Sequence, residues 1–223
     1  MSEPHAVAYR ELRLRLSDVI GHADATALAG PAPATPEWCV HDVVAHVVGV
    51  ADDVVNGRLE GIATDPWTQA QVDERADSSI AEMLAEWEAN GPAFEALLAG
   101  APAEIAGQAV FDAATHEHDL RHAIGAPGAR ESDAIAQAWE WIVDARTRAG
   151  APALRFVVEG VEQVSGTGDV LATIEAPRFE LFRAVSGRRA AVEIEQYQWD
   201  RDPEPELLLA AEIFSLRDVP LGE

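Results

Sequence analysis

Residues 111 to 122 read FDAATHEHDLRH, and this segment determines how the rest of the chain is interpreted. It holds three histidines, three acids and one arginine. Apolar residues recur at helical spacing around it, so we predict a helix over residues 103–125. Each residue advances about 100° around a helix, so the spacing alone predicts which polar side chains face the core.

With His116 set to 0°, Asp112 falls at about −40°, so both side chains lie on or beside the apolar stripe, one turn apart. His118 and His122 fall at about 200° and 240° and are expected to point away from the core, into solvent. The apolar residues of this helix lie between about −20° and 80°: Ile105, Ala109, Ala113, Leu120, Ala123 and Ile124.

A second helix is predicted over residues 41–61, and His46 lies at the edge of its valine-rich stripe. Burying a carboxylate such as Asp112 is costly unless the carboxylate is paired or bound to a metal. Two histidines and one carboxylate make a three-ligand set for a divalent ion. We therefore consider His46, Asp112 and His116 a candidate metal site, although hydrogen-bonded core histidines or a simple Asp112–His116 ion pair would fit the same spacing.

The rest of the pattern predicts an α+β protein with two domains. A helical bundle is expected in residues 1–150, and a polar loop through Thr64, Asp65 and Pro66 interrupts it. Near residue 150, β-branched and aromatic residues replace the helical period, so residues 151–223 are predicted to form a small mixed α/β domain. The predicted helices span 5–28, 41–61, 77–100, 103–125, 132–149, 179–187 and 205–214. The predicted strands lie in 150–160 and 168–177, and 190–199 fits either a strand or a helix.

Composition narrows the classes of partner. The chain carries 39 acids against 16 bases, a formal charge of −23, which disfavours nucleic acid and anionic membranes as partners. All the bases are arginine, so chemistry that needs an internal lysine is excluded. The longest apolar runs fall well short of the roughly 18 residues of a membrane span. The first residues lack a secretory pattern and Cys39 is the single cysteine, so a cytoplasmic protein is expected. We expect a monomer or a homodimer.

The segment RFELFRAVSGRR, residues 178–189, concentrates positive charge in an otherwise acidic chain. Arg183, Arg188 and Arg189 are therefore candidates for binding the anionic groups of a substrate during catalysis. The alternative is that these arginines form ordinary ion pairs that offset the acidic surface. The sequence leaves both interpretations open.

Three segments together resemble one known family. They are WCVHDVVAHVVGVADDV at 38–54, DAATHEHDLRHAIG at 112–125 and FELFRAVSGRR at 179–189. Their order and spacing resemble the mycothiol-dependent maleylpyruvate isomerase family, within the broader DinB-like group of metal-binding helical bundles. The resemblance implies a DinB-like four-helix bundle, with one extra helix, followed by a small C-terminal domain.

The resemblance also implies a site and an activity. His46, Asp112 and His116 would bind a divalent metal, most often zinc, and Asp112 stands where the family often has the longer glutamate. Asp119 would orient a ligand or Arg121, and the alternative for Asp119 is an ordinary salt bridge at the surface. The cosubstrate would be mycothiol, a low-molecular-weight thiol of actinobacteria, and the protein would be an isomerase or S-transferase acting on a small electrophile. The alternatives are a non-catalytic metal- or thiol-binding protein of this fold and a metal-dependent hydrolase.

Overall fold

The computed structural model describes residues 2–209 and 214–223. It divides into two compact units, Met1–Gly128 and Ala129–Glu223. The first unit is helical and the second combines helices with a four-stranded sheet, so the predicted α+β class is confirmed. Along the chain, the first unit ends at Gly128 and the second begins at Ala129. The sequence pattern predicts this boundary near residue 150. The difference is α7 (Asp133–Arg148), which packs against elements of the second unit.

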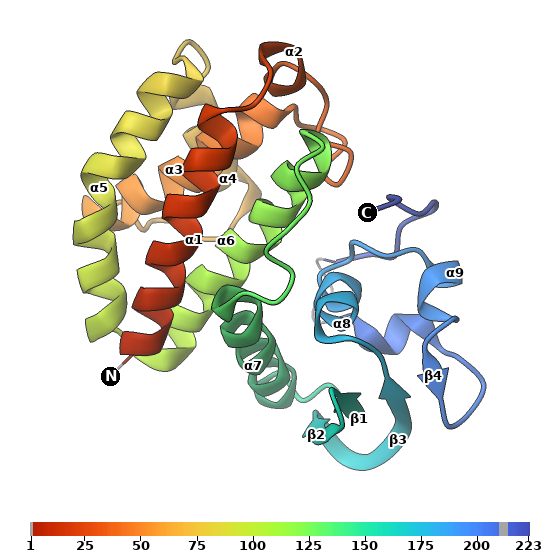
Figure 1. Ribbon diagram of the computed structural model, residues 1–223. Helices are drawn as coiled ribbons and strands as arrows, with labels where there is room; N and C mark the ends of the chain where they lie inside the picture. Colours follow the sequence, from red (N-terminus) through yellow and green to blue (C-terminus); the bar gives the residue numbers. More distant parts are fainter. Residues whose placement is uncertain (1, 210–213) are drawn as a thin grey trace. The chain divides into compact units, whose positions relative to one another are not determined.

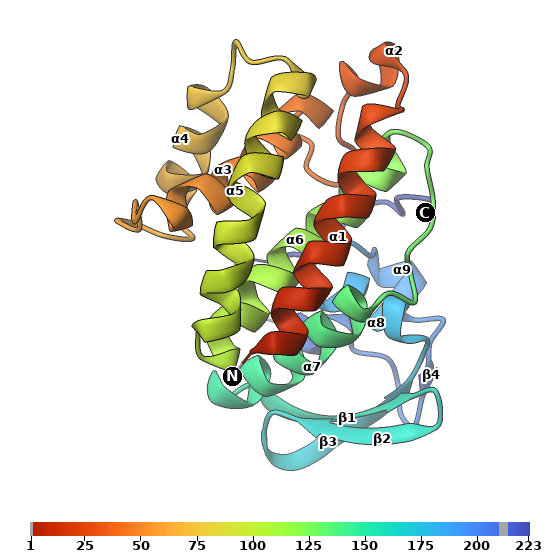
Figure 2. The same ribbon diagram turned by 60° about the vertical axis from the view of Figure 1, so that its left-hand side comes forward.

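The first unit is built on four long helices. These are α1 (Glu3–Gly21), α3 (Val40–Val55), α5 (Ile80–Gly100) and α6 (Ala103–Ala123). Helices α1 and α3 each contact both α5 and α6, and the two ribbon views show them packed as a bundle (Figures 1 and 2). Leu12, Val44, Trp87 and Leu120, one from each helix, are fully or almost fully buried. The short α2 (Ala25–Leu28) follows α1.

Helix α4 (Asp65–Glu74) was not predicted. The sequence was interpreted as a polar loop through Thr64, Asp65 and Pro66, but these three residues begin a helix. Pro66 lies in the first turn, where the missing N–H has no intrahelical partner to lose. Helix α4 packs against α3 and buries Gln71 and Val72.

The second unit contains a sheet of strand order β2-β1-β3-β4. Its strands are β1 (Pro152–Val158), β2 (Val161–Ser165), β3 (Thr167–Glu175) and β4 (Gln198–Trp199). Strand β1 pairs antiparallel with β2 and parallel with β3. Helix α7 contacts β2 (Figure 2). Trp139 of α7 packs edge-on against Phe156 of β1, with their ring centroids 5.1 Å apart. This contact forms part of the core of the unit.

The remaining elements of the second unit are α8 (Arg178–Val185), α9 (Ala191–Ile194) and the 3₁₀ helix η1 (Pro205–Leu208). The stretch 190–199, predicted as a strand or a helix, contains both α9 and β4. The predicted helix over 205–214 begins as η1, and its residues 210–213 lie outside the described residues. Within the described residues, no helix combines the length and the apolar character that a membrane crossing requires.

Candidate metal site

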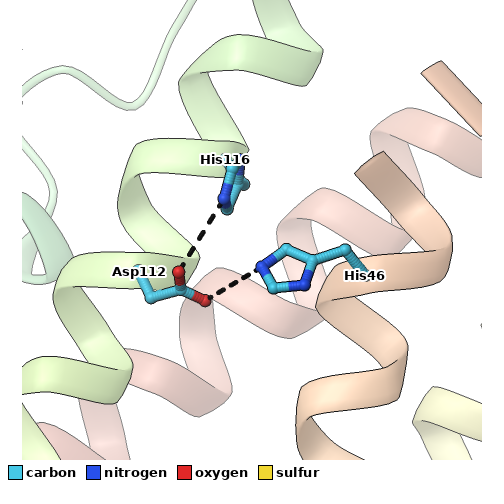
Figure 3. A group of neighbouring side chains, drawn as sticks. All are labelled: His46, Asp112 and His116. Carbon is cyan, nitrogen blue, oxygen red and sulfur yellow. Dashed lines mark ion pairs between the residues drawn. The ribbon is translucent and has the colours of Figure 1, made fainter. Parts of the chain in front are cut away.

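The structure brings the three predicted ligands together. His46 comes from α3, and Asp112 and His116 come from α6. Each offers one ligand atom, and these atoms all lie within 4.8 Å of one another. Nε2 of His46 is 3.7 Å from Oδ2 of Asp112, and Nε2 of His116 is 3.8 Å from Oδ1 of Asp112 (Figure 3). Both imidazoles therefore present Nε2 to one carboxylate.

Helix geometry explains this convergence. Asp112 and His116 are four residues apart, so their side chains stack one turn above the other on α6. His46 reaches them from α3, and its ring lies edge-on to that of His116 with the centroids 4.9 Å apart. The two histidines are buried, with 4% and 8% exposure, whereas the Asp112 side chain is 38% exposed. Of the three side chains, the carboxylate has by far the largest exposed fraction.

The other ring nitrogen of His46 is held by a buried chain of polar groups. Nδ1 of His46 lies 2.8 Å from Oε1 of Gln71, and Nε2 of Gln71 donates to Oδ2 of Asp53 at 2.8 Å. Nε of Arg58 donates to the second oxygen of Asp53 at 2.7 Å. Neither Gln71 nor Asp53 was predicted to belong to the site. Gln71 is carried by α4, whose existence the apolar pattern did not indicate.

The outer nitrogen of His116 faces an acid on its own helix. Nδ1 of His116 lies 3.2 Å from Oδ2 of Asp119, which is completely buried. Arg121 donates instead to Glu117, at 2.9 Å, and Arg15 of α1 binds the same carboxylate at 2.8 Å. Of the two partners expected for Asp119, the structure therefore places His116 beside it.

Two other histidines of α6 were expected to face solvent. His118 is buried, with 4% exposure, so this prediction was wrong for it. His122 is half-buried. The cause is that α6 is buried on all sides between Ala113 and Arg121, so the angle from the apolar stripe does not predict exposure there.

The environment of His46 favours its protonated form. Burial acts to lower the pKa of the ring, but the hydrogen bond and charge of Asp112, together with the contact to Gln71, outweigh burial and raise the pKa above its ordinary value. A proton and a metal ion compete for the same nitrogen. The negative charge that favours the proton also favours a cation.

Trp38 forms an apolar side of this cluster. Its ring centroid is 5.4 Å from that of His46 and 6.3 Å from that of His116. The half-buried ring of Trp38 lies beside both histidines. Cys39 follows at the N-terminus of α3, and burial is the main cause that raises the pKa of its thiol, which disfavours a reactive thiolate.

The three arginines of the second unit are engaged with other groups. Arg183 and Arg189 are buried and both bind Glu223, with N–O distances of 3.0 and 2.8 Å. Arg189 also donates to Glu180 at 2.7 Å, and Arg188 donates to the carbonyl of Ser186. Arg183 and Arg189 thus have carboxylate partners. Binding of substrate anions by these arginines stays a prediction.

Comparisons with known proteins place this geometry in context. Neither a protein-family model nor a curated protein sequence matches the chain. Two solved structures are similar, the mycothiol-dependent maleylpyruvate isomerase and a point mutant of it, at 12% and 11% identity. Each has a TM-score of 0.65 and covers 92% of this chain and 95% of its own. The chain has the fold of this isomerase. The predicted resemblance is thus confirmed at the level of the fold.

The cluster also meets the chemical requirements of a metal site. Metal-binding histidines use one ring nitrogen as the ligand, while the other donates to a protein acceptor that fixes the ring. His46 and His116 both present Nε2 inward, with Gln71 and Asp119 beside their Nδ1 atoms. Three protein ligands are the set that catalytic zinc sites use, and this set leaves one position open. These residues therefore fit a divalent ion.

Proposed function

We propose that this protein is a metal-dependent, mycothiol-using isomerase or S-transferase that acts on a small electrophile. The observation that carries the proposal is the His46–Asp112–His116 cluster, with both Nε2 atoms facing one carboxylate. Its occurrence on the fold of the mycothiol-dependent maleylpyruvate isomerase supports mycothiol as the cosubstrate. Zinc is the ion we propose, since two imidazoles and a carboxylate suit it.

The three side chains would share the work of holding the ion. His46, Asp112 and His116 would hold a divalent ion, and a thiol bound to that ion would be deprotonated near neutral pH. His46 and His116 act as neutral donors, and Asp112 contributes the one negative charge among the ligands. Gln71 would keep the ring of His46 in place, and Asp119 lies 3.2 Å from Nδ1 of His116. Trp38 excludes water from one side, which strengthens the electrostatic interactions there.

The groups proposed to bind the substrate are three arginines of residues 178–189. Arg183, Arg188 and Arg189 would bind anionic groups of the electrophile, in line with their concentration of positive charge. A substrate anion would have to compete with Glu223 for Arg183 and Arg189. The partners in this proposal are a small-molecule substrate and a low-molecular-weight thiol, and the compartment is the cytoplasm.

The proposal is tested by metal content, thiol binding and thiol-dependent turnover. Purified protein should contain a divalent metal, and His46→Ala, Asp112→Ala and His116→Ala should each lose it. The matched control is His22→Ala, because the His22 side chain is 81% exposed and lies at the end of α1. If metal content and thiol binding are indifferent to all three ligand changes, the proposal is wrong.

The same experiment separates the alternative functions. An isomerase or transferase should convert a reactive electrophile only when mycothiol is added. A metal-dependent hydrolase would convert its substrate without the thiol, because the ion would activate water. A non-catalytic binding protein would retain metal and thiol without turnover.

A further inference from the structure

Gln71 is a buried amide with both of its ends engaged. It is 1% exposed on α4, its Oε1 lies 2.8 Å from Nδ1 of His46, and its Nε2 donates to Asp53 at 2.8 Å. A buried amide is costly unless its polar atoms find partners, and each end of this amide has one. The arrangement links His46 to an ionised pair on the far side of the amide.

Asp53 determines which way round the amide lies. Its Oδ1 accepts a hydrogen bond from Nε of Arg58 at 2.7 Å, so this oxygen is the partner of a guanidinium group. An ionised carboxylate only accepts hydrogen bonds, so it must face the NH₂ end of Gln71. The carbonyl end of Gln71 is then left to face His46. Asp53 is itself buried, which restricts access of water to this contact.

The carbonyl oxygen in turn determines which nitrogen of His46 carries the proton. Oε1 of Gln71 has no hydrogen, so a hydrogen bond at 2.8 Å requires Nδ1 of His46 to be the donor. A neutral imidazole with its proton on Nδ1 has its lone pair on Nε2. Nε2 is the atom that faces Asp112. We propose that Gln71, oriented by Asp53 and Arg58, is a positioning residue that fixes His46 in the tautomer able to bind the metal.

The packing of α4 on α3 makes this contact possible. A Cβ atom at Gly49 of α3 would lie 2.6 Å from Cβ and 2.7 Å from Cγ of Gln71. Glycine at residue 49 therefore leaves the room that Cβ and Cγ of Gln71 occupy against α3. Arg75, one turn after Gln71, donates to the carbonyl of Gln71 and fixes the backbone at this point.

The inference rests on the proposed metal site, but its first test needs neither metal nor activity. Nitrogen-15 NMR of the metal-free wild-type protein in alkaline buffer, where the ring is neutral, reports the tautomer of His46 directly. We expect the proton on Nδ1. A proton on Nε2 would overturn the inference, whatever the behaviour of any variant.

Zinc affinity, measured by competition with a chromophoric chelator, gives the second test. Gln71→Met keeps the length of the side chain but cannot accept the hydrogen bond, and the Kd for Zn²⁺ should rise 10- to 100-fold. Gln69→Met is the matched control. It makes the same change on the same helix, at an exposed residue whose amide donates to Asp73, and its Kd should equal that of the wild type.

Asp53→Asn tests whether Asp53 sets the orientation of the Gln71 amide, and it keeps the size of the side chain at residue 53. The NH₂ group of the new asparagine could face Gln71, whose amide would then turn its own NH₂ group towards His46. That arrangement selects the proton on Nε2, so the Kd for Zn²⁺ should rise as much as in Gln71→Met. Asp73→Asn makes the same charge change at an exposed residue of α4, and it should leave the Kd unchanged.

The outcomes separate this inference from the proposed function. If His46→Ala loses zinc while Gln71→Met and Asp53→Asn bind it with the wild-type Kd, the positioning role is wrong and the metal site stands. If His46→Ala, Asp112→Ala and His116→Ala all bind zinc as the wild type does, the proposed function itself is wrong. Circular dichroism and thermal unfolding check that each variant is folded. If a variant does not fold, the NMR measurement on the wild-type protein still tests the tautomer of His46.

Discussion

At the scale of single residues, the buried histidines differ in what faces each ring nitrogen. His46 has an amide oxygen at Nδ1 and a carboxylate oxygen near Nε2, and His116 has a carboxylate oxygen near each nitrogen. His118 is equally buried but does not belong to the metal-binding group found among the described residues. Burial of an imidazole alone therefore does not place it in the candidate site. His46 and His116 are distinguished by the carboxylate that they share, Asp112.

The buried pair Tyr9 and Trp87 allows a residue-scale prediction. Nε1 of Trp87 donates to the hydroxyl of Tyr9 at 2.9 Å, and both side chains are almost fully buried. Tyr9→Phe keeps the ring contact with Phe94 but leaves the indole N–H without this acceptor. We expect the free energy of unfolding to fall by about 1–3 kcal/mol, measured by urea denaturation.

A comparison with Tyr197→Phe controls for loss of a hydroxyl. Tyr197 is half-buried, and its hydroxyl donates to the carbonyl of Glu180 at 3.1 Å. That carbonyl can be hydrated more readily than a fully buried indole, so the cost should be smaller. Equal costs in the two variants would contradict the explanation by burial.

Single-residue predictions from the sequence succeeded where spacing along one helix was sufficient. The angle between Asp112 and His116 depends only on helix geometry, and the structure stacks them as predicted. The exposure of His118 depends on what surrounds α6, which its own sequence does not contain. Gln71 was missed for a similar reason, because its partner His46 belongs to another helix.

At the scale of elements, α4 carries the Gln71 contact to His46 although it has little apolar pattern of its own. Among its ten residues, only Gln71 and Val72 are buried. Such a helix gains most of its stability from packing on a neighbour, here α3, and little from an amphipathic period. This explains why the long helices were predictable while α4 was interpreted as a loop.

The close approach of α3 and α4 leads to an element-scale prediction. Gly49→Ala would place a methyl group 2.6 Å from Cβ of Gln71 and 2.9 Å from Nη1 of Arg75, so α4 must shift. We expect a loss of about 1–3 kcal/mol in the free energy of unfolding, as for other overpacked cores. Zinc affinity should fall as well, because Gln71 moves with α4.

The control for this change is Gly100→Ala at the end of α5. An added Cβ there meets nothing within 4 Å, so the substitution should be neutral or stabilise the helix by up to about 1 kcal/mol. A Gly49→Ala variant as stable as Gly100→Ala, with wild-type zinc affinity, would show that α4 adapts without cost.

At the scale of the whole molecule, the chain stabilises its two units with buried arginine–carboxylate pairs. Arg13 binds Glu95 in the first unit, and Arg183 and Arg189 share Glu223 in the second.

The fold class could be predicted from the change of period near residue 150, but the unit to which α7 belongs could not. An amphipathic helix shows that it has a partner without showing which one, and α7 packs on the sheet side of the change.

The network around Glu223 predicts a pH dependence of stability. Burial acts to raise the pKa of this carboxyl, but Arg183 and Arg189 outweigh burial and lower it below the ordinary value of 4.5. A lowered pKa means that the ionised form stabilises the folded state above pH 4.5 and that this contribution is lost as the pH falls through the lowered value.

Glu223→Gln should therefore lower the free energy of unfolding by about 3 kcal/mol at neutral pH. The difference from the wild type should shrink in acid, measured by urea denaturation across a pH series. Glu206→Gln, at an exposed residue of η1, provides the control and should change little at any pH. A difference between Glu223→Gln and the wild type that is independent of pH would refute the role of the charge.

The three clustered side chains come from helices that are distant in the sequence, with α4 and α5 between them. An ion shared by His46, Asp112 and His116 would act as a cross-link that closes this long loop in the folded chain only. By mass action, free metal at a hundred times its Kd would add about 2.7 kcal/mol to the stability of the bundle. The supply of metal in the cell would then control how long the protein survives proteolysis as well as whether it is active.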